Sequence, residues 1–191
     1  MKHFSIVVAI DEKNGIGKKG GLAWKLSADL KHFKEITTTT IDPQKKNAVI
    51  MGRKTWDSLP EKFKPLPGRL NVVLSQNANQ MSFSGVLFFT FFDEALKYLN
   101  IKEEIENIFV IGGAQVYIHA LEHPKCENLY VTHLKGDFGC DTFFSNIPNT
   151  FLRKDSLAWL FEGPIQYREL QEHGRAGKGR PGLGRLTPAC R

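Results

Sequence analysis

Short apolar runs alternate with segments of helical periodicity along most of the chain. Six continuous apolar runs predict strands that are covered on both faces, at residues 4–10, 47–52, 70–75, 86–90, 108–113 and 128–134. Between and after them, helices are predicted at residues 27–36, 53–59, 93–99 and 114–121. This alternation is typical of an α/β protein with a mostly parallel central sheet and helices on both of its faces.

The first predicted helix carries an acidic residue beside its apolar face. Leu30, Phe33 and Ile36 are spaced three apart and predict the buried face, with Ser27 as the N-cap. Asp29 directly precedes Leu30, so its carboxylate lies at the edge of that face. Such an acid is either a cap or an exposed residue of the first turn, or a buried functional group. If it is buried, it stays charged only when a partner donates two hydrogen bonds to it.

The net charge is concentrated at the carboxyl end. Lys and Arg total 26 against 20 Asp and Glu, which gives +6, and residues 174–191 hold four arginines, one lysine and no acid. Residues 1–173 are therefore almost neutral, which argues against nucleic acid as a partner. We predict one folded domain over residues 1–173 and a disordered tail over residues 174–191, because the tail is rich in glycine and lacks an apolar period. Contact of the tail with RNA is the alternative, although no aromatic side chain there could stack on bases.

Other sequence features suggest a cytoplasmic protein without a metal site. No apolar run approaches the length of a membrane span, and the amino terminus leads into a strand without a cleavage pattern. The three cysteines, Cys126, Cys140 and Cys190, lack a C-x-x-C spacing and are predicted to be free thiols. His119 and His123 are four residues apart, which fits either a metal site or an exposed helix end. No third ligand lies nearby, so no metal site is predicted.

Three strand ends carry residues suited to binding phosphate. In VIGGAQVY a strand turns into a helix through two glycines, which lets a phosphate approach the backbone. In MGRKTWDSL a helix begins with Arg53, Lys54 and Thr55, an unfavourable place for cations unless an anion is bound. Close packing and a solvated basic turn are the respective alternatives. With Ser75 at the end of a third strand, the set fits a dinucleotide, although the G-x-G-x-x-G pattern is absent.

One arginine stands at the entry to the buried strand at 70–75. Arg69, in LPGRLNVV, has a planar guanidinium that suits a carboxylate through two parallel hydrogen bonds. The chain therefore offers a candidate anion-binding residue as the counterpart of Asp29.

These residues occur together in an order that resembles the dihydrofolate reductase family. The resemblance rests on GIGKKGGLAWKLSADLKHF, VIMGRKTWDSLP, LPGRLNVVLS, FVIGGAQVY, and LYVTHL followed by DTFF, and it covers most of the chain. It implies a single twisted, mostly parallel sheet of about eight strands. It also implies an NADPH-dependent enzyme that reduces 7,8-dihydrofolate to 5,6,7,8-tetrahydrofolate by hydride transfer to pterin carbon 6 with protonation of nitrogen 5. Antifolate inhibitors would bind the same site.

The resemblance also implies roles for individual residues. The family's acid, here Asp29, holds the pterin ring with help from the threonine at Thr132. The loop with Leu22 and Trp24 closes over the nicotinamide, and these four residues are the catalytic candidates. The expected substrate-binding residues are Val7, Val8, Ala9, Leu30, Phe33, Leu59, Leu66, Arg69, Ile111 and Tyr117, with Arg69 holding the glutamate carboxylate.

The remaining expected contacts are with NADPH. Basic and hydroxyl side chains would bind its phosphates, and the glycine pair with the two residues after it would bind its pyrophosphate. The full expected set is Ala9, Ile16, Gly17, Gly52, Arg53, Lys54, Thr55, Leu74, Ser75, Gln76, Ile111, Gly112, Gly113, Ala114, Gln115 and Tyr117.

Three features depart from the family pattern. Ala23 replaces a common proline, so the closing loop should be less rigid. Gln76 and Thr90 stand where some relatives place arginines against the cofactor's 2′-phosphate, which leaves Arg53 and Ser75 as the main contacts. The phosphorylated cofactor is still expected to be preferred, but by a smaller margin. After GPIQYR the expected aromatic and polar alternation stops. Either the last strand is curtailed, with residues 169–172 forming a short, poorly buried edge, or the native sequence is altered near Arg168.

Two rival functions stay open at the level of sequence. The reductase of riboflavin biosynthesis resembles this fold but lacks an acid equivalent to Asp29. A protein that binds nucleotide or RNA without catalysis would use the tail. The chain could also be the reductase half of a longer fusion with thymidylate synthase.

Overall fold

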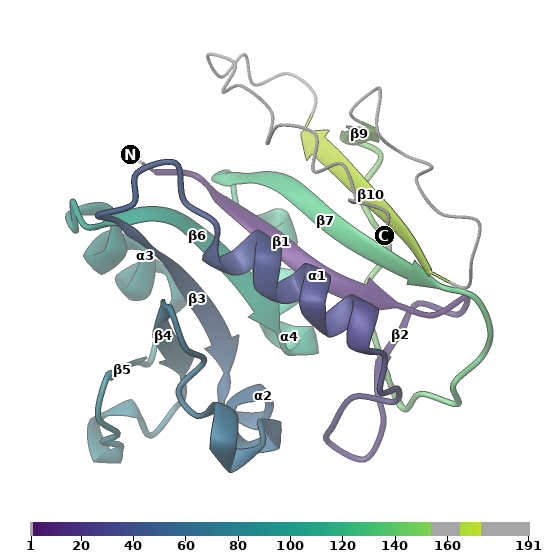
Figure 1. Cartoon of the computed structure of the whole chain (residues 1–191), viewed down its shortest axis with the longest axis horizontal. Coiled ribbons are helices and arrows are strands. Elements are labelled where there is room, and N and C mark those ends of the chain that lie inside the picture. Colours follow the sequence, from purple (N-terminus) through teal and green to yellow (C-terminus); the bar gives the residue numbers. More distant parts are fainter. Residues whose placement is uncertain (1, 154–164, 173–191) are drawn as a thin grey trace, which may run out of the picture.

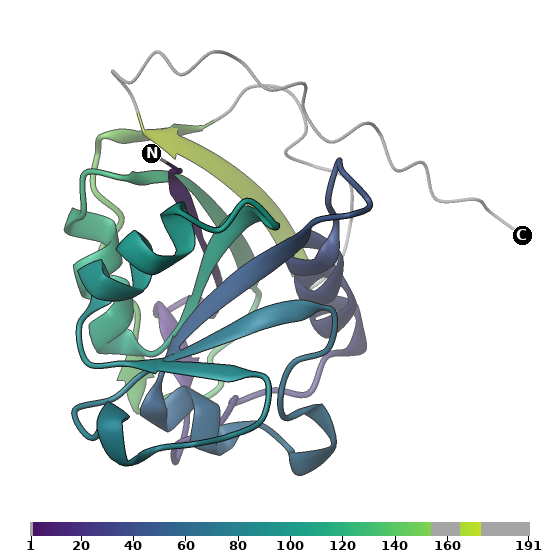
Figure 2. The same ribbon diagram turned by 90° about the vertical axis from the view of Figure 1, so that its left-hand side faces the viewer.

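The structure, a computed structural model, describes residues 2–153 and 165–172. An eight-stranded twisted sheet forms its centre (Figures 1 and 2). In spatial order the strands are β5 (Val86–Phe89), β4 (Arg69–Leu74), β3 (Lys46–Gly52), β6 (Ile105–Gly112), β1 (Phe4–Ile10), β7 (Cys126–Leu134), β10 (Ile165–Glu172) and β9 (Phe151–Arg153). Neighbours from β5 to β7 are parallel, and β10 is antiparallel to both β7 and β9. The predicted α/β class and mostly parallel sheet are confirmed, and all six apolar runs form strands.

Helices cover both faces of the sheet because successive side chains of a buried strand point to opposite sides. Ile6 and Val8 of β1 belong to one core cluster, with apolar residues of α3 (Phe92–Asn100) and α4 (Ala114–Glu122). Val7 belongs to a second cluster on the other face, against Phe33 and Ile36 of α1 (Ser27–Thr38). Figure 1 shows α1 in front of the sheet and α4 behind it. The second cluster also contains Trp56 of the short helix α2 (Arg53–Ser58), which ends before Pro60 as predicted.

The start of α1 differs from the sequence prediction in two ways. Ser27 is the first helical residue and not the N-cap, which is Leu26 and makes no side-chain capping bond. Leu30 is not part of the buried face but is 49% exposed, whereas Asp29 is buried. The helix is turned so that the acid faces the sheet.

The last strand also differs from the prediction. β10 is not curtailed at the point where the alternation stops, but runs to Glu172 and pairs with β7 over residues 165–171. Residues 170–172 are not an edge either, because β9 pairs with them on the other side. Backbone hydrogen bonds to two neighbours hold this strand although its side-chain pattern is irregular. The predicted tail at 174–191, and with it Cys190, lies outside the described residues.

A second, two-stranded sheet was not predicted from the sequence. It pairs β2 (Gly15–Gly17) with β8 (Thr142–Phe143) and joins the loop after β1 to the segment after β7. Two short 3-10 helices, η1 (Glu61–Phe63) and η2 (Ala78–Gln80), complete the described elements. Strands this short carry too few residues for an alternation pattern to be recognised.

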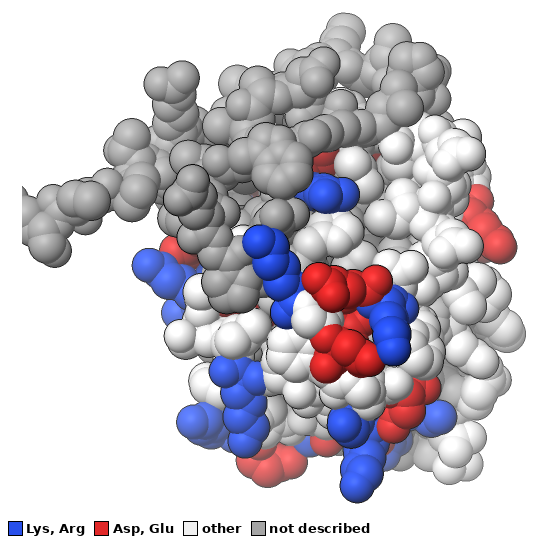
Figure 3. Space-filling view, turned by 90° about the vertical axis from the view of Figure 1, so that its right-hand side faces the viewer, with Lys and Arg blue, Asp and Glu red and all other residues white. Residues whose placement is uncertain are grey.

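Several features singled out in the sequence can be followed in the described residues. Cys126 is buried in β7, and Cys140 is a half-buried free thiol. Among the described residues, no helix is long and apolar enough to cross a bilayer. His123 accepts a hydrogen bond from the N–H of Lys125 and contacts Asp93 at 3.1 Å, so it has protein partners at the end of α4. Acidic and basic side chains lie beside one another on the face that carries the β7–β8 segment (Figure 3).

Candidate active site

A cleft of about 1820 Å³ opens at the carboxyl ends of the parallel strands. Its walls come from α1 on one side and from the strand-to-helix turns that follow β3, β4, β5 and β6 on the other. Every residue predicted to contact substrate or cofactor lines this cleft. In parallel sheets the carboxyl ends of strands share one edge, which is why residues so far apart in sequence meet here.

Asp29 lies on the wall formed by α1, and its carboxylate is buried. Its Oδ2 accepts a hydrogen bond from the indole Nε1 of Trp24 at 3.2 Å, and the Thr132 hydroxyl donates a second one. Burial raises the pKa of Asp29, and these two hydrogen bonds offset only part of that effect. Within the described residues, no Lys, Arg or His forms an ion pair with it. The carboxylate therefore has two hydrogen-bond donors but no cationic partner, and the two donors do not compensate fully for its burial.

An unpaired buried carboxylate should cost folding free energy when it ionises. Because its pKa is higher in the folded chain than in the unfolded chain, the contribution of Asp29 to folding is full below about pH 3.9 and is lost as the pH rises through the higher pKa of the folded chain. We expect Asp29→Asn to raise the melting temperature at pH 7 by a few degrees, on the order of 2–4 °C. Thermal unfolding at pH 7 and pH 4 measures this, and the difference should shrink at pH 4. A lower melting temperature of the variant at pH 7 would contradict the electrostatic cost.

Arg69 lies at the other end of the same wall, and it too is buried. Its Nη1 donates to the Thr37 hydroxyl at 2.7 Å and its Nε to the Pro67 carbonyl at 3.1 Å, while the guanidinium lies 5.6 Å from the ring centre of Phe33. Burial lowers the pKa of Arg69 to about 10. The described residues include no carboxylate within ion-pair distance of it. These contacts fix the plane of the guanidinium and leave its remaining N–H groups for an anion from the cleft.

The turn from β6 into α4 is shaped to admit a ligand. Gly112 has a φ of 137°, which favours glycine, and a Cβ on either Gly112 or Gly113 would lie 3.1 Å from the Thr55 hydroxyl. No side chain caps the start of α4, so its first backbone N–H groups are free to meet an anion. The glycine pair therefore lets the backbone of this turn pack closely against Thr55 of α2.

The loop between β1 and α1 is held to the loop after β7. Asp11 accepts hydrogen bonds from the N–H groups of Gly15, Lys13 and Phe138, at 2.7, 2.9 and 3.2 Å. Burial opposes its ionisation, but these bonds outweigh burial and lower the pKa of Asp11. The ring of Trp24 also packs edge-on against Phe138, with ring centres 5.4 Å apart. The loop that carries Trp24 is thus tied to a second loop at the side of the cleft.

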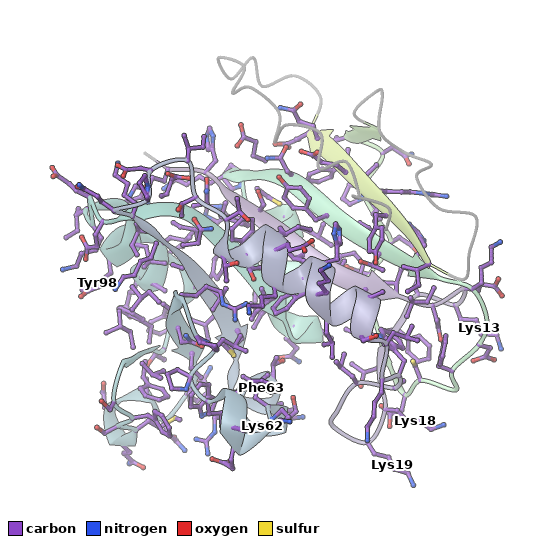
Figure 4. The ribbon with its side chains drawn as sticks, viewed as in Figure 1. Lys13, Lys18, Lys19, Lys62, Phe63 and Tyr98 are labelled. Carbon is purple, nitrogen blue, oxygen red and sulfur yellow. The ribbon has the colours of Figure 1, made fainter. Side chains whose placement is uncertain are left out.

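Several residues that line the cleft were missed at the level of sequence. Phe63 and Phe91 are 45% and 62% exposed, and Lys34 and Lys62 add positive charge. Figure 4 shows Lys62 and Phe63 on the α2 side of the opening, with Lys18 and Lys19 on the opposite loop. A phenylalanine in a loop gives no sign in the sequence that it borders a cavity. Exposed lysines give no such sign either, because most lysines are solvated surface residues.

Comparison with known proteins agrees with this geometry. A sequence model of the dihydrofolate reductase family matches residues 3–157. The chain is 44% identical to a dihydrofolate reductase of Drosophila melanogaster over 152 residues, which are 79% of this chain and 84% of that protein. It is 42% identical to one of Heliothis virescens over 146 residues, 75% and 79% of the two chains. It is 47% identical to a bifunctional dihydrofolate reductase-thymidylate synthase of Zea mays over 147 residues, 74% of this chain and 28% of that protein. The match extends from the first strand to the segment that follows β9, and the chain therefore belongs to the dihydrofolate reductase family of oxidoreductases.

Proposed function

We propose that this enzyme reduces 7,8-dihydrofolate to 5,6,7,8-tetrahydrofolate with NADPH, by hydride transfer to pterin carbon 6 and protonation of nitrogen 5. One observation carries the proposal: Asp29 and Arg69 line the same cleft, both are buried, and neither has an oppositely charged partner among the described residues. A ligand with adjacent N–H donors at one end and a carboxylate at the other would satisfy both. Dihydrofolate is such a molecule.

The side chains between these two groups suit the middle of that substrate. The aminobenzoyl ring needs apolar walls, and Leu30, Phe33 and Leu66 line the cleft on that side. Leu30, which the fold leaves half exposed, would be covered by the ring. The pterin would lie against Val7 and Val8, with its amino group and ring N–H on Asp29.

The residues on the other wall fit a nicotinamide dinucleotide. A Cβ at Gly112 or Gly113 would press on the hydroxyl of Thr55, one of the groups expected to hold the pyrophosphate beside the start of α4. The uncapped start of α4, with the side chains of Thr55 and Lys54, would hold that pyrophosphate. Tyr117 donates to the Val7 carbonyl at 2.9 Å and joins this wall to the pterin side.

The chain's own residues position the reactants and tune their charge. NADPH, when bound, supplies the hydride. Two N–H donors from the pterin would let Asp29 stay ionised despite its burial, and its field would favour the protonated form of nitrogen 5. The proton itself comes from water, because Asp29 holds the far edge of the ring. Closure of the loop with Leu22 and Trp24 would exclude bulk water and strengthen that field.

A direct assay tests the proposal. The protein is mixed with dihydrofolate and NADPH, and the loss of the near-ultraviolet absorbance of the reduced nicotinamide is followed. We expect turnover that requires both compounds and that stops when an antifolate is added. An absence of turnover in a folded preparation that binds neither compound would refute the function.

The glycine turn gives a sharper test of the cofactor wall. Gly113 has a backbone conformation that alanine can adopt, so Gly113→Ala adds only a Cβ, 3.1 Å from the Thr55 hydroxyl. We expect NADPH affinity to fall about 10-fold or more, as a displaced charge-assisted contact would cause. Calorimetric titration measures it, with unchanged binding of dihydrofolate and an unchanged melting curve as controls. Equal losses for both ligands would instead indicate a general distortion.

A fusion to thymidylate synthase, as the name of the Zea mays relative describes for that protein, stays a prediction for this chain. Sequencing the transcript beyond the codon for residue 191 would test it.

A further inference from the structure

Two aromatic side chains without a role in the function described so far lie next to Asp29. His32 is three residues after Asp29 on α1, a spacing that places the two side chains on the same side of the helix. The ring centre of His32 lies 3.8 Å from that of Tyr167 on β10, and the two ring planes are tilted by 46°. His32 also lines the cleft, and both rings are half-buried. A ring contact beside the acid therefore joins α1 to β10.

The ring pair is also linked to Asp29 through the neighbouring strand. Tyr167 lies opposite Thr132 in the register of β10 and β7, and directly opposed side chains lie on the same face of a sheet. The Thr132 hydroxyl donates a hydrogen bond to Asp29. Burial raises the pKa of Tyr167, and the charges of Asp29 and Glu35 raise it further. One cluster from three elements thus surrounds the acid: Asp29, His32, Thr132 and Tyr167.

Asp29 is shielded from water although it borders a large cleft. The residue is only 6% exposed, and burial is the main cause that raises the pKa of its carboxyl group. Trp24 and Thr132 cover part of the carboxylate through the hydrogen bonds that they donate. Tyr167 and His32 lie on the side of β10, so their ring pair is placed to keep water from reaching the carboxylate there.

We propose that His32 and Tyr167 are positioning residues whose paired rings exclude bulk water from Asp29, so that the carboxylate takes its further hydrogen-bond donors from the bound pterin. The role of the pair in the reaction rests on the proposed function. Water at this position would offer competing donors to the carboxylate and would weaken its field at nitrogen 5. The ring pair therefore supports both the binding of the pterin and its protonation.

The pair acts through its rings and not through a charge. Burial lowers the pKa of His32, and the charge of Glu35 opposes this effect only in part, so the imidazole is neutral at pH 7. Burial and then the charge of Asp29 raise the pKa of Tyr117 on α4, so this tyrosine and Tyr167 are also neutral. A phenylalanine in place of either ring of the pair should consequently preserve the shielding, whereas an alanine should not.

The titration of Asp29 itself tests the proposal. The indole N–H of Trp24 donates to Asp29 at 3.2 Å, so its nuclear magnetic resonance signal should shift as the carboxyl group titrates. The signal is followed from about pH 4 to about pH 8 in the full chain without ligands, and Asp29→Asn identifies the shift that belongs to this group. We expect a lower midpoint in His32→Ala and in Tyr167→Ala, toward that of an exposed carboxyl group. His32→Phe and Tyr167→Phe should keep the midpoint of the wild type.

A matched control removes one ring from a pair elsewhere in the fold. Tyr98 on α3 packs against Phe89 with ring centres 5.5 Å apart, and neither of these two residues lines the cleft. Figure 4 shows Tyr98 on the opposite side of the molecule from Lys18 and Lys19, which belong to the same loop as Trp24. Tyr98→Ala should lower the melting temperature but leave the titration of the Trp24 signal unchanged. A general loss of stability is thereby separated from a loss of shielding.

Steady-state kinetics at pH 7 measures the consequence for the reaction. His32→Ala should lower kcat/KM for dihydrofolate by about 3- to 10-fold, as the weakening of one hydrogen bond by water would cause, and His32→Phe should restore most of that loss. In the Asp29→Asn background, His32→Ala should change kcat/KM by less than about 2-fold, because the rings act through the carboxylate.

The outcomes separate this inference from the proposed function. An unchanged midpoint of the Trp24 signal in His32→Ala, or equal shifts in His32→Phe and His32→Ala, overturns the inference. An undiminished kinetic loss in the Asp29→Asn background overturns it as well. Absence of turnover in the wild type would refute the proposed function, whereas the titration, which needs no substrate, would still decide whether the rings keep water from Asp29.

Discussion

Replacement of Asp29 by asparagine should lower kcat/KM for dihydrofolate by about 10²- to 10⁴-fold at pH 7, the range found when a positioned charged group is removed. The amide has nearly the shape of the carboxylate but no negative charge, so it cannot favour protonation of nitrogen 5. It also presents an N–H₂ group toward N–H donors of the pterin, which weakens the complex. Steady-state kinetics with saturating NADPH measures the loss.

The pH dependence distinguishes an electrostatic role from a structural one. As the pH falls, solution acid protonates nitrogen 5 without help, so the variant should recover part of its activity relative to wild type.

NADPH affinity should not change, because Asp29 lies on the opposite wall of the cleft from the glycine turn. The same variant is expected to melt at a higher temperature at pH 7. Lower activity with higher stability is the trade-off typical of a functional buried charge. An unchanged turnover would remove Asp29 from the mechanism.

The layout of the sheet could be predicted from the sequence because its parallel strands are covered on both faces. For that reason the sequence contains a continuous apolar run for each of the strands β1, β3, β4 and β6. Such runs can be recognised without any other sequence for comparison. β10 was predicted incorrectly because its stability comes from backbone bonds to β7 and β9, which do not depend on the alternation of its side chains. β2 and β8 are also paired through backbone atoms, so their side-chain pattern did not predict the pairing.

The site was harder to predict than the fold. Periodicity places Leu30, Phe33 and Ile36 on one face, yet it cannot tell a side chain buried in the core from one that borders a cavity. The prediction therefore placed Leu30 in the core, although its side chain is half exposed beside the cleft. The role of Asp29 stayed open until the resemblance to the family suggested one. For the Arg53–Asp57 pair, the sequence shows the interaction but not its location. Its spacing of four residues is visible in the sequence, but only the structure shows that Arg53 borders the cleft while paired.

Replacement of Arg69 by glutamine should raise KM for dihydrofolate by about 10²- to 10³-fold with a smaller change in kcat. The guanidinium would bind the glutamate carboxylate in the ground state and in the transition state alike, so its loss removes uniform binding. Glutamine can still donate one hydrogen bond toward Thr37 but offers neither the charge nor the planar fork. Arg69→Lys should recover only part of the affinity, because an ammonium restores the charge without the two parallel bonds.

A truncated substrate tests whether Arg69 acts by contacting the glutamate carboxylate. A dihydropterin that lacks the glutamyl group has no carboxylate for Arg69, so wild type and Arg69→Gln should reduce it with the same kcat/KM. The difference between the two substrates then isolates the contact between the guanidinium and the carboxylate from any effect on folding. If the variant lost activity equally toward both substrates, Arg69 would act by supporting Thr37 and Phe33, which it contacts in the structure, and the carboxylate would have to bind elsewhere in the cleft.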